Sequence, residues 1–356
     1  MTTDLSTSPR RDTRLRAAAL DIDASSERGL ESLSLGLGAV AFVLVALVAL
    51  VAFQFEPAPI SGPGSVGQFA AISSAVVAID AFIAGRYIMH TRAPGRRLGV
   101  LDFVDVAALS FAHGIIALLT WTLLAVILEQ SFLGAEVFAL PLLIISGAAA
   151  ALTAYATFYS ATHMDLQLLG TLLAVFLAEG VIASMLTASD PEWWKNNLSA
   201  LGMTDDISSL AFNLTLIVAG VIVTTLARYA TQGIPTPNPQ GVGRVRVTLI
   251  VVGVFLGLVG VFPVDQYWAL HTGVASGMLV AYGVLAVRLG HWIPGMPRAF
   301  VLLGWLFLAV SAGLAVLFFV GYYTLTAVEL VAGLLVFTWI ILFIRNAHAL
   351  QQDSGR

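Results

Sequence analysis

The stretch LSLGLGAVAFVLVALVALVAFQF, residues 33–55, contains no charged side chain over 23 consecutive positions. About 20 predominantly apolar residues are enough for a helix to cross a hydrocarbon core of roughly 30 Å. Nine further stretches of the same character follow, so the sequence predicts an all-α integral membrane protein, a bundle of about ten transmembrane helices. The predicted spans lie near residues 33–55, 66–89, 103–128, 138–159, 166–187, 208–229, 246–263, 268–289, 299–320 and 323–345.

The composition of the whole chain agrees with this fold class. Hydrophobic residues make up 58% of the 356 residues and charged residues 11%, against roughly 45–50% and about 25% in soluble domains. The chain has no cysteine, which excludes disulfides, thiolate chemistry and cysteine-based metal sites. Since catalytic zinc usually has three protein ligands and the predicted outer face offers one histidine, we expect no metal and no cofactor.

The basic residues give the predicted orientation, because Lys and Arg accumulate in cytoplasmic loops. With a cytoplasmic amino terminus, 16 of the 17 basic residues fall on the cytoplasmic side and Lys195 alone lies outside. The sequence therefore predicts a multi-pass protein of the cell (plasma) membrane with both termini in the cytoplasm. The predicted cytoplasmic residues are Arg10, Arg11, Arg14, Arg16, Arg28, Arg86, Arg92, Arg96, Arg97, Arg228, Arg244, Arg246, Arg288, Arg298, Arg345 and Arg356.

Four segments are expected along the chain. No cleavable signal peptide is apparent, since the first apolar run follows some thirty polar residues and is too long for a signal sequence. Residues 1–32 are predicted to form a cytoplasmic leader that is disordered or lies at the membrane interface. Residues 33–160 are predicted to form a four-helix addition, 161–346 a six-helix core and 347–356 a cytoplasmic tail.

Two loops on the predicted outer face carry most of the polar and aromatic side chains. They are SDPEWWKNNLSALG, residues 189–202, and GVFPVDQYW, residues 260–268. An acid within a span needs a partner or a function, because an ionisable group in hydrocarbon costs about 2.5–3.5 kcal/mol. The alternative for the tryptophans is an interfacial belt, which Trp prefers. The candidate ligand-binding residues are Glu179, Asp190, Trp193, Asn197, Ser199, Asn213, Asp265, Trp268 and His271.

Short motifs in the second half of the chain resemble a prokaryotic membrane family, "domain of unknown function 998". The motifs are Asn197-Leu198-Ser199-Ala200-Leu201-Gly202, then Ala211-Phe212-Asn213, then Gly260-Val261-Phe262-Pro263 with Asp265, and His271 entering the next helix. The resemblance covers the fifth to tenth predicted helices and implies a multi-pass membrane protein, but it supplies no activity. A fainter similarity links the pattern to the Frag1, DRAM and Sfk1 membrane proteins, some of which are tied to lipid remodelling.

Four functional hypotheses remain open after this reading. The first is binding or handling of a membrane lipid or other amphiphile at the outer residues. The second is a proton-coupled secondary transporter that uses Glu179, Glu329 and His113. The third is a membrane hydrolase or acyltransferase in which His271 acts as base toward Ser199 or a water held by Asp190 or Asp265. The fourth is a structural role in which the first four helices bind other membrane proteins.

Several classes of function are excluded by the residues that the sequence lacks. The chain has no lysine in a predicted span to anchor a retinal Schiff base, and no Walker-type phosphate-binding loop. Outside the loops that set the topology it has no basic patch large enough for nucleic acid, so no nucleic-acid partner is expected.

Overall fold

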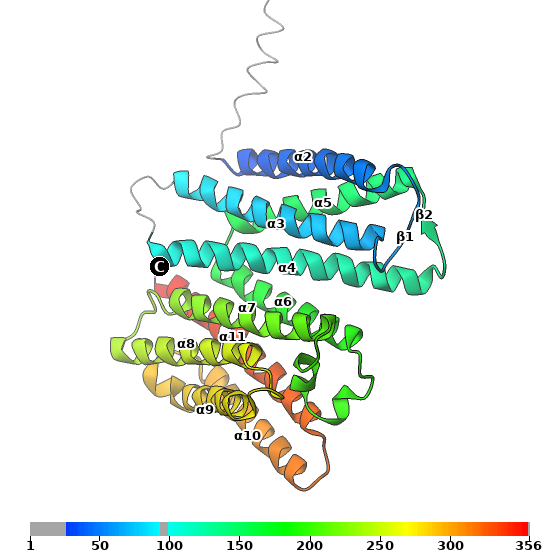
Figure 1. Cartoon of the computed structure of the whole chain (residues 1–356). Helices are drawn as coiled ribbons and strands as arrows, with labels where there is room; N and C mark the ends of the chain where they lie inside the picture. The colour runs from blue at the N-terminus through cyan, green and yellow to red at the C-terminus, as the bar shows by residue number, and fades with distance from the viewer. Residues whose placement is uncertain (1–25, 93–98, 355–356) are drawn as a thin grey trace, which may run out of the picture. The chain divides into compact units, whose positions relative to one another are not determined.

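The structure is a computed structural model that describes residues 26–92 and 99–354 (Figure 1). In these residues ten helices are long and apolar enough to cross a membrane, which confirms the predicted fold class. They are α2 (Glu27–Phe53), α3 (Val66–Thr91), α4 (Val100–Ser131), α5 (Ala139–Thr162), α6 (Leu166–Thr187), α7 (Ile207–Ala230), α8 (Pro239–Val261), α9 (Trp268–Trp292), α10 (Arg298–Phe319) and α11 (Leu325–Ser354).

The first and last of these helices are longer than their predicted apolar cores. Helix α2 begins at Glu27 because the side chain of Ser26 caps it, accepting the N–H of Gly29 at 3.1 Å. The last part of the predicted leader is therefore helical, whereas residues 1–25, on which the rest of that prediction falls, lie outside the described residues. Helix α11 continues to Ser354, through most of the predicted tail.

Two short strands interrupt the otherwise helical chain. Strand β1 (Ala58–Pro59) pairs antiparallel with β2 (Glu136–Val137), and Ala58 lies opposite Val137. The pair joins the loop after α2 to the loop after α4. These strands were not predicted, because two residues are too few to give a periodic pattern.

The chain divides into two compact units. The first unit comprises residues 1–97 and 124–162, and the second comprises 98–123 and 163–356. Residues 100–123 of α4 therefore group with the second unit, whereas the division predicted from sequence placed them with the first four helices. The predicted division of the chain into a four-helix addition and a six-helix core at 160/161 stays a prediction.

Small residues let the helices of the first unit approach closely. A Cβ atom added at Gly147 of α5 would lie 2.9 Å from the carbonyl oxygen of Phe42 in α2. A Cβ at Gly85 of α3 would lie 2.7 Å from the Cβ of Ala161 in α5. Close backbone approach through small residues is a common way for membrane helices to associate. Helix α5 therefore serves as the common packing partner of α2 and α3.

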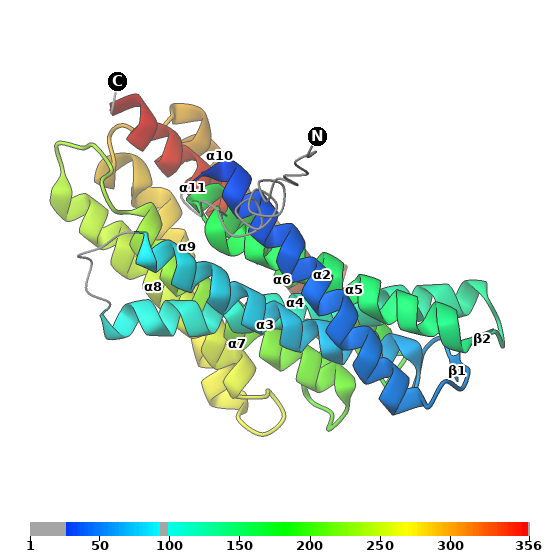
Figure 2. The same ribbon diagram turned by 90° about the horizontal axis from the view of Figure 1, so that it is seen from above.

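In the second unit, α7 is the central helix and lies beside α8 (Figures 1 and 2). A Cβ at Gly220 of α7 would lie 2.5 Å from the carbonyl oxygen of Gly253 in α8. On its other side, α7 packs against α6, where Thr215 fills the space left by Gly180. Helix α7 is thus held along its length, and its two ends are fixed relative to its neighbours.

Candidate functional site

The connection between α6 and α7 contains two short 3₁₀ helices, η1 (Trp193–Lys195) and η2 (Leu198–Gly202). The first half of this connection is organised locally. Asp190 accepts the backbone N–H of Glu192 at 2.8 Å, and Lys195 pairs with Glu192 at 2.5 Å. The ammonium group of Lys195 also lies 5.7 Å from the ring centre of Trp194. These charges are therefore engaged near the surface of the loop.

The second half, η2, is anchored to two transmembrane helices. Glu329 of α11 accepts the backbone N–H of Leu198 at 2.6 Å. From α7, the hydroxyl of Ser208 donates to the carbonyl of Leu201 at 3.3 Å, and Nδ2 of Asn213 donates to the carbonyl of Gly202 at 3.1 Å. These three hydrogen bonds fix η2 at Leu198, Leu201 and Gly202.

Ser199 in η2 and His271 in the first turn of α9 are hydrogen-bonded to each other. Nε2 of His271 lies 3.0 Å from Oγ of Ser199, and Nδ1 lies 2.7 Å from the carbonyl oxygen of Phe262. Both side chains are buried, with 6% of His271 and 9% of Ser199 exposed. The structure therefore brings together two residues 72 positions apart that the sequence singled out as candidates.

The N-terminus of α7 is capped by Asp206. Its carboxylate accepts the N–H of Ser209 at 2.9 Å and the hydroxyl of Ser189 at 2.6 Å. Desolvation alone would raise the pKa of Asp206, but bonds from the side chains of Ser189 and Thr204 and the N–H groups of Ser209 and Ser189 lower this pKa to about 2. Asp206 is therefore ionised at neutral pH.

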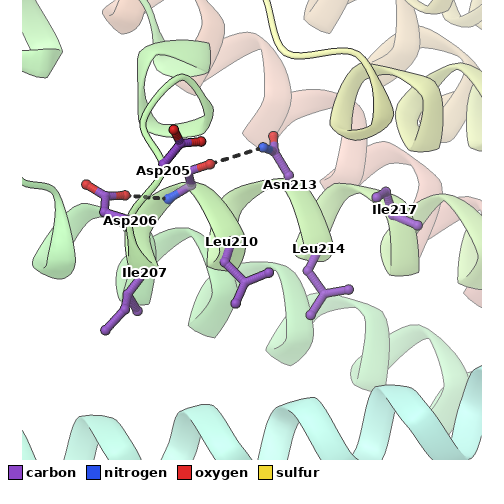
Figure 3. Close-up of a pocket in the computed structure, with 8 residues that line it drawn as sticks. Asp205, Asp206, Ile207, Leu210, Asn213, Leu214 and Ile217 are labelled. Atoms are coloured by element: carbon purple, nitrogen blue, oxygen red, sulfur yellow. Dashed lines mark hydrogen bonds between the residues drawn. The ribbon is translucent and has the colours of Figure 1, made fainter.

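An open groove of about 680 Å³ runs along one face of α7 from this cap (Figure 3). Both of its acidic residues lie at the end near the cap, beside Ile207, and the residues further along the helix are apolar except for Ser209 and Asn213. All eight lining residues are neutral or acidic. They are Asp205, Asp206, Ile207, Ser209, Leu210, Asn213, Leu214 and Ile217. The groove therefore has both acidic and apolar lining residues.

The nine ligand-binding residues predicted from the sequence are not gathered in one cavity. Of these, Asn213 alone lines the groove. Ser199 and His271 form the buried pair, and Asn197 directly precedes the same 3₁₀ helix without a capping hydrogen bond from its side chain. Glu179 of α6 accepts the hydroxyl of Thr120 in α4 at 2.8 Å. Asp190 and Trp193 belong to the first half of the connection. Asp265 is exposed in the loop before α9, and Trp268 is exposed at the first position of α9.

The three residues of the transporter hypothesis have separate partners. Glu179 is bonded to Thr120, Glu329 to the N–H of Leu198, and His113 lies 2.7 Å from the carbonyl of Leu109 through its Nδ1. None of these bonds links one of the three to another.

Sequence reasoning missed two features of the second unit. One is the groove, whose Leu210, Leu214 and Ile217 look in the sequence like ordinary lipid-facing residues. The other is Asp105 of α4, which is paired with Arg228 of α7 at 3.3 Å. A buried acid early in a predicted span was a signal for this pair, but Arg228 was read only as a determinant of topology.

The family comparison agrees with the motifs around this site. The model of the family "Protein of unknown function (DUF998)" matches residues 168–346, half of the chain, from α6 to α11. The matched region contains η2, Asn213, the segment 260–263 and His271. Comparison with curated proteins and with solved structures finds no match. The fainter similarity to Frag1, DRAM and Sfk1 stays an expectation, and the chain belongs to the DUF998 family of membrane-type helical proteins of unknown function.

Proposed function

We propose that the protein binds an amphiphile with an amine-bearing headgroup in the groove on α7. The observation that supports this most directly is the order of side chains along the groove. Asp205 and Asp206 lie at its polar end, and Leu210, Leu214 and Ile217 follow along the helix (Figure 3). A membrane lipid has the same order of polar and apolar parts.

The charge of the groove favours a cationic or zwitterionic headgroup. Asp206 is ionised at neutral pH, its hydrogen bonds favour the charged form further by lowering its pKa to about 2, and Asp205 is exposed beside it. Hydrogen bonds to charged groups contribute about 1.5–3 kcal/mol each. An ammonium group is therefore attracted to this end of the groove, whereas a headgroup with net negative charge is repelled by it.

The apolar wall of the groove contacts the apolar chain of the proposed ligand. Leu210 is two-thirds exposed, although it lies in a groove rather than on a convex surface. Each methylene group that leaves water contributes about 0.8 kcal/mol, but much of this gain is absent when the chain comes from a bilayer. The headgroup contacts, rather than the chain, therefore determine which lipid is selected.

The proposed location follows from the distribution of basic residues. With both termini in the cytoplasm, the connection between α6 and α7 faces the outside of the cell membrane. The groove then opens at the outer leaflet, with its acidic end at the level of the headgroups. Membrane lipids are accordingly the proposed partners.

Lipid titration of the purified full-length chain tests this proposal. In native mass spectrometry, we expect phosphatidylethanolamine to bind more tightly than phosphatidylglycerol with the same acyl chains. Leu214→Trp fills the groove and should abolish the difference between the two lipids. Val254→Trp places the same side chain on an exposed position of α8 outside the groove, and should leave the difference unchanged.

A charge reversal tests the role of the acidic end separately. Asp205→Lys should lower the affinity for phosphatidylethanolamine about tenfold, or about 1.4 kcal/mol, and raise that for phosphatidylglycerol. Asp205 is suited to this change because it is exposed, whereas Asp206 caps α7. Equal binding of both lipids by the wild type, or an unchanged preference in Leu214→Trp, would refute the proposal.

A further inference from the structure

From the geometry of Ser199 and His271 we infer that they form a nucleophile and a general base that cleave a carboxylic ester. The substrate class, an ester of an amphiphile at this end of the second unit, rests on the proposed function. The inference about the two residues rests on their own contacts. Those contacts determine the direction of the hydrogen bond, the position of the base and the position of the nucleophile.

The direction of the hydrogen bond follows from the partner of Nδ1. The carbonyl oxygen of Phe262 can only accept, and it lies 2.7 Å from Nδ1 of His271, so Nδ1 carries the proton. In the neutral ring, Nε2 then holds the lone pair and accepts the proton of Ser199 Oγ at 3.0 Å. A serine hydroxyl that donates to a histidine within about 2.6–3.2 Å is the arrangement by which a weak nucleophile is activated.

The base is held in this orientation by the end of α8. Phe262 is the residue that follows α8, and its N–H is bonded to the carbonyl of Leu258 at 3.0 Å. Its ring packs edge-to-face against Tyr267, with ring centres 5.4 Å apart. The carbonyl of Phe262 is therefore fixed from two directions, and it occupies the place that a carboxylate takes when it orients a catalytic histidine.

The nucleophile is held equally firmly. The N–H of Leu198, the residue before Ser199, donates to Glu329 at 2.6 Å. At the other end of η2, Gly202 accepts a hydrogen bond from Asn213, which also lines the groove. The short helix that carries Ser199 is thus bonded directly to a residue of the proposed binding site. Catalytic groups need such support, because a displacement of about 0.5–1 Å is enough to lose activity.

The reaction uses only the ester, water and these two side chains. Oγ of Ser199 attacks the carbonyl carbon while its proton moves to Nε2 of His271. The C–O bond of the ester then breaks, the leaving alkoxide takes the proton from Nε2, and the acyl group stays on Ser199. A water molecule attacks the acyl-serine with His271 again as base, which releases the carboxylic acid and restores the serine hydroxyl.

A fluorophosphonate probe with an alkyl chain tests the pair without knowledge of the natural substrate. The purified full-length protein is incubated with the probe, and the modified residue is identified by peptide mass spectrometry. We expect modification at Ser199 in the wild type. His271→Gln should slow this modification about 100-fold or more, and Ser199→Ala should remove it. Hydrolysis of p-nitrophenyl octanoate should fall in parallel.

Ser311→Ala is the matched control for the loss of a buried serine in the second unit. Ser311 of α10 donates to the carbonyl of Phe307 in its own helix at 2.9 Å, so its removal should leave modification of Ser199 unchanged. Wild-type protein without modification at Ser199 would overturn the inference, and so would modification at an equal rate in a folded His271→Gln variant. In either case the Ser199–His271 bond only holds η2 against α9.

The outcomes also separate this inference from the proposed function. If Ser199 is modified but Leu214→Trp retains the wild-type lipid preference, the groove is not the binding site and the reactive pair stands. If the groove selects lipids but Ser199 is not modified, the inference fails and the binding function stands.

Discussion

Aspartate side chains lie near both ends of α7, buried and fully bonded at one end and accessible at the other. Near the C-terminal end, Asp105 of α4 accepts hydrogen bonds from Thr225 at 3.2 Å and Tyr229 at 3.1 Å, and pairs with Arg228 at 3.3 Å. Both of its carboxylate oxygens are occupied, and only 6% of the residue is exposed. Near the N-terminal end, Asp205 and Asp206 line an open groove.

The difference separates a cluster whose acceptor atoms are filled by the protein from one whose acceptor atoms are accessible. A buried carboxylate with all its acceptor sites filled has no capacity for another donor. The carboxylate of Asp105 instead joins α4 to α7, two helices whose contacting residues lie 120 or more positions apart in the sequence. The acidic end of the groove keeps accessible acceptor atoms. Since the two clusters are about 28 Å apart along the helix axis at 1.5 Å per residue, each can be altered without direct contact with the other.

The largest expected effect comes from breaking the buried cluster. Arg228→Ala leaves the carboxylate of Asp105 without its counter-charge, and we expect a loss of about 3 kcal/mol in the free energy of unfolding, measured by denaturant titration in detergent. The double variant Asp105→Leu, Arg228→Met should recover most of this loss, because it removes both charges. If Arg228→Ala is as stable as the wild type, the cluster does not hold α4 to α7.

A smaller effect is expected where α7 crosses α8 between the two clusters. Gly220→Ala places a methyl group 2.5 Å from the carbonyl oxygen of Gly253, and such overpacking typically costs about 1–3 kcal/mol. Gly243→Ala in α8 is the control, since no atom lies within 4 Å of its added Cβ. That control should stabilise the helix by about 0.5–1 kcal/mol. Equal unfolding midpoints for the two variants would contradict the close crossing.

The sequence predicted the spans well because each span is a local feature. Apolar length alone located the ten helices, whereas their ends depend on capping groups and on polar extensions such as Glu27 at the start of α2. The pairing of Asp105 with Arg228 was not predictable in the same way. Asp105 early in a predicted span indicates that a partner is needed. The identity of that partner depends on which helices are neighbours, and a single sequence does not show this.

The candidate site was predicted in part for a similar reason. Ser199 and His271 were identified because Ser199 lies in one of the two polar outer loops of the predicted topology and His271 follows shortly after the other. Their mutual bond required the positions of η2 and α9. The groove was missed because it depends on the three-dimensional shape around Leu210 and Leu214, and leucine on a membrane helix gives no sign of whether it faces lipid or lines a groove.

The smallest expected effect concerns the charge of Asp206 at the open end of α7. The folded state lowers the pKa of this carboxyl from 3.8 to about 2, so the ionised form stabilises the fold. That contribution is complete above about pH 4 and is lost as the pH falls toward about 2.

Asp206→Asn keeps a side-chain acceptor for the helix cap but has no charge to lose. The difference in unfolding free energy between wild type and Asp206→Asn should therefore be constant from pH 5 to 7 and shift against the wild type at pH 3. Asp206→Ala removes the cap itself and should cost about 1 kcal/mol at neutral pH. A wild-type minus Asp206→Asn difference that does not change between pH 6 and pH 3 would mean that the bonds from Ser189 and Ser209 do not lower the pKa of Asp206 in the folded state.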